Sequence, residues 1–285
     1  MRIINSTKKY FKLFVNPEHH NPSWNLNFAG KVSSFPLLWL HGFMGSSHDW
    51  QNFVTEGFSD YCNILVDLPG HGNASIEEGS HYEDLLNDLC SQLSAAGFDT
   101  FIPVGYSMGG RLAFHLQRCC TDQITAIVGI SSAPGLKSES ERIKRMAADR
   151  ELMTKLRSQG LERFLREWYA MPLFQHIGKD RPLLEALIHS RAQNDPVQLG
   201  RSLELLGNGA LPSLWGELSK IELPVLLLTG EADQKYCALN QEMAGELPNA
   251  EHHVIIDADH ALHLEKPLET TDLIRHFLRR VIKGD

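Results

Sequence analysis

Val104-Gly105-Tyr106-Ser107-Met108-Gly109-Gly110-Arg111 places a serine between the end of an apolar run and the beginning of a helical pattern. The apolar run covers residues 101–104, and the helical pattern continues through residues 112–116. The glycines of Gly105-x-Ser107-x-Gly109 let the backbone turn tightly enough to expose the serine hydroxyl. We therefore predict a strand, a sharp turn and a helix, with Ser107 as a candidate nucleophile. An ordinary glycine-rich turn is the alternative.

The length and net charge of the chain limit the classes of protein to which it can belong. Its 285 residues can form one large α/β domain, or a domain with a sizeable insertion. The net charge of −8 argues against general nucleic-acid binding, and no apolar run of about 18 residues could span a membrane. The segment Met1–Lys9 lacks the apolar stretch of a secretory signal. We expect a cytoplasmic enzyme.

The cysteines and histidines form no metal-site pattern. No C-x-x-C pair occurs, so we expect reduced thiols rather than a zinc site or a disulfide framework. His260-x-x-His263 lacks the H-E-x-x-H spacing and a third ligand, so we expect no metal and no cofactor, with His263 structural or facing the lid described below. The five cysteines are Cys62, Cys90, Cys119, Cys120 and Cys237.

Apolar runs alternate with helical patterns along most of the chain. Leu85, Leu86, Leu89 and Leu93 fall on one face of a helix expected over residues 82–93. Such alternation predicts a mostly parallel sheet with helices on both sides, and ligands bind beyond the carboxyl ends of such strands. The expected strands cover residues 36–40, 62–67, 101–106, 124–130, 224–229 and 253–257, with a weaker one around 24–28.

One long segment contains no convincing strand. Residues 134–218 show only helical patterns, broken at Gly160, Pro172, Pro182 and Pro196. An all-helical insertion between two strands predicts a lid over the site. We therefore expect a core of residues 1–133 and 219–285 and a lid of residues 134–218.

A serine hydroxyl needs an imidazole to take its proton and a carboxylate to orient that imidazole. Asp233 follows the expected strand 224–229, and His260 follows the expected strand 253–257. The order Ser107, Asp233, His260 is the serine, acid, histidine order of the fold that carries such turns. Other acids remain open: Glu231 as an alternative acid, and Asp257 and Asp259 as alternative partners of the histidine.

Two backbone amides are candidates for an oxyanion hole. The amide of Met108 begins the helix after Ser107, where the helix dipole favours negative charge. The amide of Phe43 lies in His41-Gly42-Phe43, directly after the apolar strand 36–40. We expect these two amides, rather than their side chains, to stabilise a developing oxyanion.

Several of these motifs together resemble the α/β-hydrolase fold over nearly the whole chain. They are His41-Gly42-Phe43, Asp67-Leu68-Pro69-Gly70-His71-Gly72, Gly105 to Gly110, Gly230-Glu231-Ala232-Asp233 and Asp259-His260. A narrower resemblance is to the 2-succinyl-6-hydroxy-2,4-cyclohexadiene-1-carboxylate synthase (MenH) family. It rests on Gly105 to Arg111, Trp168-Tyr169-Ala170-Met171-Pro172-Leu173-Phe174, Leu211-Pro212-Ser213-Leu214-Trp215 and Gly230 to Tyr236.

The narrower resemblance implies a carbon-oxygen lyase of menaquinone or phylloquinone biosynthesis. Its members abstract a proton from the substrate ring and eliminate pyruvate, with the triad as base, an oxyanion hole for the enolate and no acyl-enzyme. Two positions depart from the family pattern without removing a catalytic group. Asp259 precedes His260 where many relatives have glycine, and Tyr236 replaces a more usual phenylalanine.

Arg111 lies four residues after Ser107, about one helical turn along the same face. An esterase for neutral substrates gains little from a guanidinium there, whereas a small anionic substrate with several carboxylates would gain charge-assisted hydrogen bonds. The resemblance extends substrate binding to Arg145, Arg191 and Trp168, with Tyr106 and Lys235 as weaker additions. We expect most other lid arginines to lie on helix faces that contact solvent.

Two other functions remain open. The first is a hydrolase of the same fold, either a carboxylesterase or a carbon-carbon bond hydrolase. The second is a non-catalytic binding module that keeps the pocket. The complete set Ser107, Asp233 and His260 argues against the binding module, and Arg111 argues against a hydrolase of apolar substrates.

Overall fold

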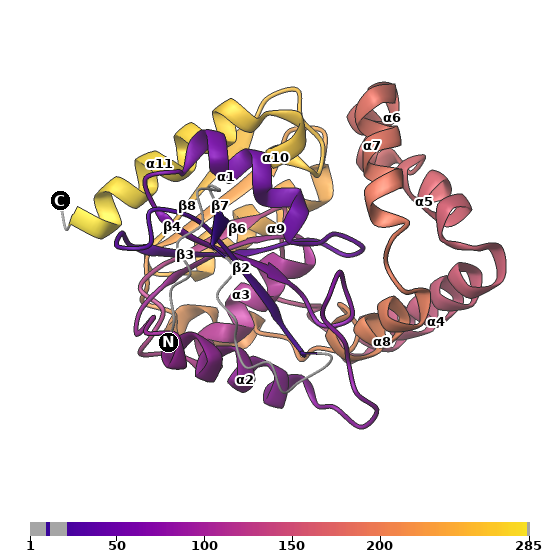
Figure 1. The fold of residues 1–285 in the computed structure, drawn as a ribbon, viewed down its shortest axis with the longest axis horizontal. Coiled ribbons are helices and arrows are strands. Elements are labelled where there is room, and N and C mark those ends of the chain that lie inside the picture. Colours follow the sequence, from indigo (N-terminus) through magenta and orange to yellow (C-terminus); the bar gives the residue numbers. More distant parts are fainter. Residues whose placement is uncertain (1–9, 12–21, 284–285) are drawn as a thin grey trace.

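The computed structural model describes residues 10–11 and 22–283, which build an eight-stranded sheet with helices on both faces (Figure 1). The segment Met1–Lys9, where the sequence predicts no secretory signal, lies outside the described residues. The strand order is β1-β2-β4-β3-β5-β6-β7-β8; β1 and β2 pair antiparallel to their neighbours and the other pairs are parallel. The strands are β1 (Tyr10–Phe11), β2 (Asn25–Gly30), β3 (Pro36–Leu40), β4 (Cys62–Asp67), β5 (Ile102–Tyr106), β6 (Ile127–Ile130), β7 (Val225–Gly230) and β8 (Ala250–Ile255).

Both faces of the sheet are covered, which explains the continuous apolar runs in its inner strands. In β4, Ile64 and Val66 pack into the core on one face, whereas Leu65 packs into the core on the other. Helices α2 (Tyr82–Ala95), α3 (Met108–Cys119) and α9 (Gln234–Glu246) cover the first face, and α1 (Gln51–Gly57) and α11 (Pro267–Lys283) cover the second. In Figure 1, α1 and α11 lie above the sheet and α2 and α3 below it. The predicted layers are thus confirmed.

Between β6 and β7 the described chain holds helices and no strand. Gly160, with φ 82°, ends the first helix, and Pro182 and Pro196 lie in the first turns of two later helices, where proline is well tolerated. Figure 1 shows this segment standing to one side of the sheet. Its helices are α4 (Glu139–Gln159), α5 (Leu161–Tyr169), η2 (Pro172–Phe174), α6 (Gln175–Lys179), α7 (Arg181–Arg191), α8 (Pro196–Leu206) and η3 (Trp215–Lys220).

The sequence did not predict β1, and two predicted strands begin three residues away from their expected starts. β6 begins at Ile127, and Ile124 forms only an isolated bridge with Phe101. β8 covers Ala250–Ile255, three residues earlier at its start than the expected run 253–257. β8 is an edge strand whose side chains are mostly half-buried, so an apolar run does not mark its position.

The cysteines require a correction. Cys90 and Cys120 form a disulfide with a Cα–Cα distance of 6.3 Å, whereas we expected reduced thiols throughout. Cys90 lies on α2 and Cys120 directly follows α3, and these two helices pack against each other. The two cysteines are close because the helices pack together in the folded chain, and their separation of 30 residues in the sequence does not indicate this contact. None of the helices in the described ranges is long and apolar enough to cross a membrane.

Candidate active site

Ser107 lies at the apex of the turn between β5 and α3. It adopts φ 51° and ψ −108°, a strained conformation for a residue with a side chain. The turn is tight because two glycines allow close backbone contacts: a Cβ on Gly105 would collide with the Gly109 backbone, and one on Gly109 with the Leu40 carbonyl. The predicted strand, turn and helix are therefore present, and they hold the Ser107 hydroxyl at the carboxyl edge of the sheet.

Asp233 and His260 reach Ser107 from the loops after β7 and β8. His260 Nδ1 lies 2.6 Å from Asp233 Oδ2, and His260 Nε2 lies 3.0 Å from Ser107 Oγ. A carboxylate only accepts hydrogen bonds, so Nδ1 carries the proton and Nε2 can accept from the serine hydroxyl. Both His260 and Asp233 are buried. The three groups form a hydrogen-bonded chain with the arrangement that can activate a serine.

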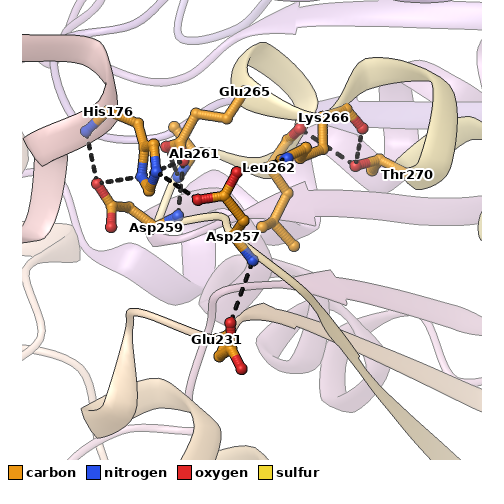
Figure 2. A network of polar contacts seen from close by, with 9 residues as sticks. All are labelled: His176, Glu231, Asp257, Asp259, Ala261, Leu262, Glu265, Lys266 and Thr270. Carbon is orange, nitrogen blue, oxygen red and sulfur yellow. Dashed lines mark hydrogen bonds and ion pairs between the residues drawn. The ribbon is translucent and has the colours of Figure 1, made fainter. Parts of the chain in front are cut away.

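The alternative acids make other contacts. Glu231 is exposed and accepts the backbone N–H of Asp257 at 3.2 Å. The Asp257 carboxylate pairs with Lys266, and the buried Asp259 accepts the backbone N–H of His176 on α6 at 2.7 Å. Figure 2 shows Glu231 directed at the Asp257 backbone, and Asp257 and Asp259 beside His176. In the described structure, Asp233 is thus the acid that contacts the His260 ring.

A cavity of about 100 Å³ opens beside the Ser107 hydroxyl. Residues from the sheet edge and from the helical segment line it together: Phe43, Tyr106, Ser107, Met108, Arg111, Arg145, Trp168, Leu173, Phe174, Arg191, Leu203, Asn208, Tyr236 and His260. A larger cavity of about 720 Å³ lies between η1 (Ser47–Trp50), α1 and α7, but Ser107, Asp233 and His260 do not line it. The smaller cavity, which Ser107 and His260 line, is therefore the candidate active site.

The sequence-predicted residues line this cavity with two exceptions, Lys235 and Asp233, and Asp233 lies behind the His260 ring. The residues with the candidate oxyanion amides, Phe43 and Met108, both line it. Trp168 packs edge-on against Phe43, with ring centroids 5.8 Å apart. Lys235 does not line the cavity; it is exposed, with Nζ 5.6 Å from the ring centre of Tyr236.

Arg111 is a buried cation with few partners. Its side chain lines the cavity, and Nη1 donates to the Leu206 carbonyl at 3.3 Å, while Nε has no partner among the described residues. Within the same residues no carboxylate forms an ion pair with it. Burial lowers the pKa of Arg111 to about 10, so the group is still protonated at neutral pH. The cavity therefore holds a positive charge that a bound anion could neutralise.

Arg145 and Arg191 also reach the cavity, but each has an acidic partner. Arg145 Nε donates to Asp149 at 2.8 Å, and Arg191 Nη2 donates to Asp49 at 2.9 Å. The second pair is almost fully buried and joins α7 to η1. Burial alone would raise the pKa of Asp49, but the charges of Arg191 and His41 outweigh burial and lower it. This pair is therefore ionised.

The sequence did not single out Leu203 and Asn208 as cavity residues. Leu203 lies on the apolar face of α8, and its helical spacing is the same as that of an ordinary core residue. Asn208 is buried just after α8, and its side-chain oxygen has no partner in the described part of the chain. Its position in Gly207-Asn208-Gly209 signals a turn, not a cavity.

One group of side chains has the spacing of a metal site. Ligand atoms of His176, Asp259 and Glu265 all lie within 4.8 Å of one another. The two carboxylates already accept backbone amides, so the cluster serves the polypeptide itself. His263 packs against the rings of Trp50 and Tyr106 instead, and burial lowers its pKa to about 3.

Comparisons with known proteins agree with this geometry. The family model described as "Alpha/beta hydrolase family" matches residues 37–273. An Escherichia coli protein named 2-succinyl-6-hydroxy-2,4-cyclohexadiene-1-carboxylate synthase is 33% identical over 246 residues, covering 85% of this chain and 93% of its own. A Bacillus subtilis protein carrying that name provisionally is 34% identical over 258 residues, covering 88% and 93%.

Solved structures show the same relationship. MenH from S. aureus superposes with a TM-score of 0.84 at 28% identity, covering 91% of this chain and 98% of its own. An esterase from Thermogutta terrifontis, at 23% identity and a TM-score of 0.77, over 90% of this chain and 93% of its own, shares the fold. The chain belongs to the alpha/beta hydrolase family and, within it, to the family of the 2-succinyl-6-hydroxy-2,4-cyclohexadiene-1-carboxylate synthases.

Proposed function

We propose that this protein is a 2-succinyl-6-hydroxy-2,4-cyclohexadiene-1-carboxylate synthase. It would eliminate pyruvate from 2-succinyl-5-enolpyruvyl-6-hydroxy-3-cyclohexene-1-carboxylate, a step of menaquinone or phylloquinone biosynthesis. The observation that carries this proposal is the buried Arg111, which lines the cavity and forms no ion pair with any acid in residues 10–11 and 22–283. A neutral ester would leave that charge uncompensated, whereas a carboxylate would receive charge-assisted hydrogen bonds from it.

The proposed reaction is a carbon-oxygen lyase step with a Ser107, His260 and Asp233 triad as its base. Ser107 Oγ takes the proton from ring carbon 2, which is acidic because it lies next to the succinyl ketone, while His260 Nε2 holds the serine proton. The C–H electrons form a new ring double bond, the existing one shifts, and the carbon–oxygen bond to enolpyruvate breaks. His260 then returns its proton to the leaving group. No acyl-enzyme forms.

The oxyanion hole has a different task in this reaction than in ester hydrolysis. Negative charge develops on the succinyl ketone oxygen as the proton leaves the ring. Phe43 and Met108 line the cavity together with Ser107, and we propose that their amides stabilise this enolate. The Met108 amide begins α3, so the helix dipole adds to the effect.

We further propose that residues 134–218 form a lid over a core of residues 1–133 and 219–285. The lid would contribute Arg145, Trp168 and Arg191 to the cavity, and the core would contribute Arg111 and the triad. Three arginines then face a substrate with three carboxylates. A substrate with this charge does not cross a bilayer unaided, so we propose that the enzyme acts in the cytoplasm where its substrate is made.

Pyruvate release from the cyclohexene substrate tests this function. We expect fast release by the wild-type protein, the spontaneous rate with Ser107→Ala, and negligible turnover of a neutral p-nitrophenyl ester. An absence of release together with a burst of nitrophenol would instead identify a carboxylesterase in which Ser107 forms a covalent intermediate.

A further inference from the structure

Glu265 binds the backbone on both sides of His260 (Figure 2). Its Oε2 accepts the N–H of Asp259 at 2.6 Å, and its Oε1 accepts the N–H of Ala261 at 3.0 Å. The Glu265 side chain is only 3% exposed. One carboxylate at the end of α10 (Leu262–Glu265) therefore fixes the two amides that flank the proposed catalytic histidine.

We propose that Glu265 is a positioning residue that holds His260 in line between Asp233 and Ser107. This inference rests on the proposed function, in which His260 accepts the serine proton. The His260 ring must meet two partners at once, and the short connection between β8 and α10 has no strand ladder to fix its backbone. The Glu265 carboxylate supplies that constraint from a helix.

The charge of Glu265 is needed for this role, because protonation would turn one oxygen into an O–H donor and weaken it as an acceptor. Burial raises the pKa of Glu265, and the hydrogen bonds from the two amides act in the opposite direction. The titratable groups that face it are Asp259, whose charge also raises its pKa, and His176, which lowers it. His176 Nδ1 lies 3.7 Å from Glu265 and 2.9 Å from Asp259.

The same contacts connect the His260 backbone to the helical segment. The Asp259 carboxylate accepts the backbone N–H of His176 at the start of α6 while the Asp259 amide donates to Glu265. Glu265 itself does not line the cavity. Its removal should therefore disturb the position of His260 without removing a contact to the substrate.

Two substitutions and one matched control test this role. Glu265→Gln keeps one acceptor but turns an NH₂ group toward a backbone N–H, and Glu265→Ala leaves both amides unpaired. We expect kcat for pyruvate release to fall roughly 10-fold in the first and roughly 100-fold in the second, the effect of a misplaced reacting group. KM should stay within about twofold, and Glu269→Gln, an exposed acid four residues later, should change neither constant.

A second measurement does not depend on the substrate. In protein with ¹⁵N-labelled histidine, the ring signals of His260 are identified by their loss in His260→Ala. We expect them to shift in Glu265→Gln and to stay unchanged in Glu269→Gln. If wild-type protein released no pyruvate, the proposed function would fail, yet these signals would still decide the role of Glu265.

The role of Glu265 is overturned by either of two results. The first is a folded Glu265→Gln protein with unchanged His260 signals and a wild-type kcat. The second is a loss confined to KM, which would indicate contact with the substrate. If Glu265→Ala does not fold, Glu265→Gln, which matches the native side chain in size, carries the test alone.

Discussion

Arg111 is a buried guanidinium that forms no ion pair among the described residues. Arg145 and Arg191, at the same cavity, each have a carboxylate partner. Desolvation of an unpaired cation is unfavourable, and burial accordingly lowers the pKa of Arg111 to about 10. A carboxylate of the substrate would supply the missing counter-charge, so Arg111 should contribute more to binding than either paired arginine.

Replacing Arg111 with methionine separates its effect on substrate binding from its effect on the stability of the protein. With Arg111→Met we expect KM for the tricarboxylate to rise roughly 10- to 100-fold, since a charged hydrogen bond contributes about 1.5–3 kcal/mol. Any turnover of a neutral ester should be unaffected. The melting temperature should increase, because the variant no longer buries an unpaired cation. Equal losses on both substrates would contradict the role in anion binding.

Asp233 and Glu231 offer a matched pair of acids on one loop. Asp233→Asn should lower kcat by roughly 10⁴-fold, because the amide no longer favours the His260 tautomer with its proton on Nδ1. Glu231→Gln should have little effect, since its carboxylate contacts the backbone of Asp257 instead. Steady-state pyruvate release measures both. A larger loss with Glu231→Gln than with Asp233→Asn would show that Glu231, and not Asp233, is the acid that orients His260.

At the scale of elements, α6 is joined to the loop after β8 by His176. Burial lowers the pKa of His176, but contacts with Asp259, Asp257 and Glu265 outweigh burial and raise it. A raised pKa in the folded protein means that the protonated form stabilises this contact. That stabilisation is complete below the ordinary pKa of 6.5 and is lost as the pH rises through the higher value.

This contact predicts a pH-dependent opening of α6. We expect hydrogen exchange of the α6 amides, corrected for its intrinsic pH dependence, to accelerate as the pH rises above 6.5 and through the pKa of His176. In His176→Gln the corrected exchange should be fast and independent of pH over the same range. A wild-type protein with pH-independent protection of α6 would show that the charge of His176 is unimportant.

The disulfide between Cys90 and Cys120 joins α2 to the end of α3, the helix that directly follows Ser107. Thiol titration of the unfolded, unreduced protein should detect three thiols, those of Cys62, Cys119 and Cys237, rather than five. Cys90→Ser should lower the free energy of unfolding by about 3.6 kcal/mol on the loop-entropy estimate. Detection of five thiols would mean that the two cysteines are reduced in solution.

Local patterns predicted most elements but missed contacts that depend on packing. The buried strands β3, β4, β5 and β7 were found because strands covered on both faces are continuously apolar. The edge strand β8 lacks that pattern, and its position was misjudged. The disulfide and the His176 contacts join residues far apart in the sequence, and no local pattern records such pairs.

For the whole molecule, the order of the functional residues along the chain predicts the site better than the residues next to each of them in the sequence. Parallel strands bring their carboxyl ends to one edge, so Ser107, Asp233 and His260 could be expected to meet there. Sequence order does not show which lid arginines face the cavity and which face water. Charged residues recur along a helix with the same spacing in both cases. Arg145 and Arg191 reach the cavity, whereas Lys235, on α9, remains exposed.

The cavity volume predicts movement of the helical segment against the sheet. About 100 Å³ is below the roughly 300–1,000 Å³ of typical small-molecule sites, so the substrate cannot bind without an opening of this interface. We expect hydrogen exchange in α5 to α7 to slow when the reaction product is added, while the inner strands of the sheet stay unchanged. Equal exchange with and without saturating product would contradict this movement.

The unpaired charge of Arg111 also connects metabolism to the amount of enzyme. A ligand that binds only the folded state stabilises it, by about 2.7 kcal/mol at a concentration 100 times its Kd. Without substrate this stabilisation is absent, so a larger unfolded fraction should be open to cellular proteases. We therefore expect the enzyme to persist longer in cells that supply its substrate than in cells whose pathway is blocked one step earlier.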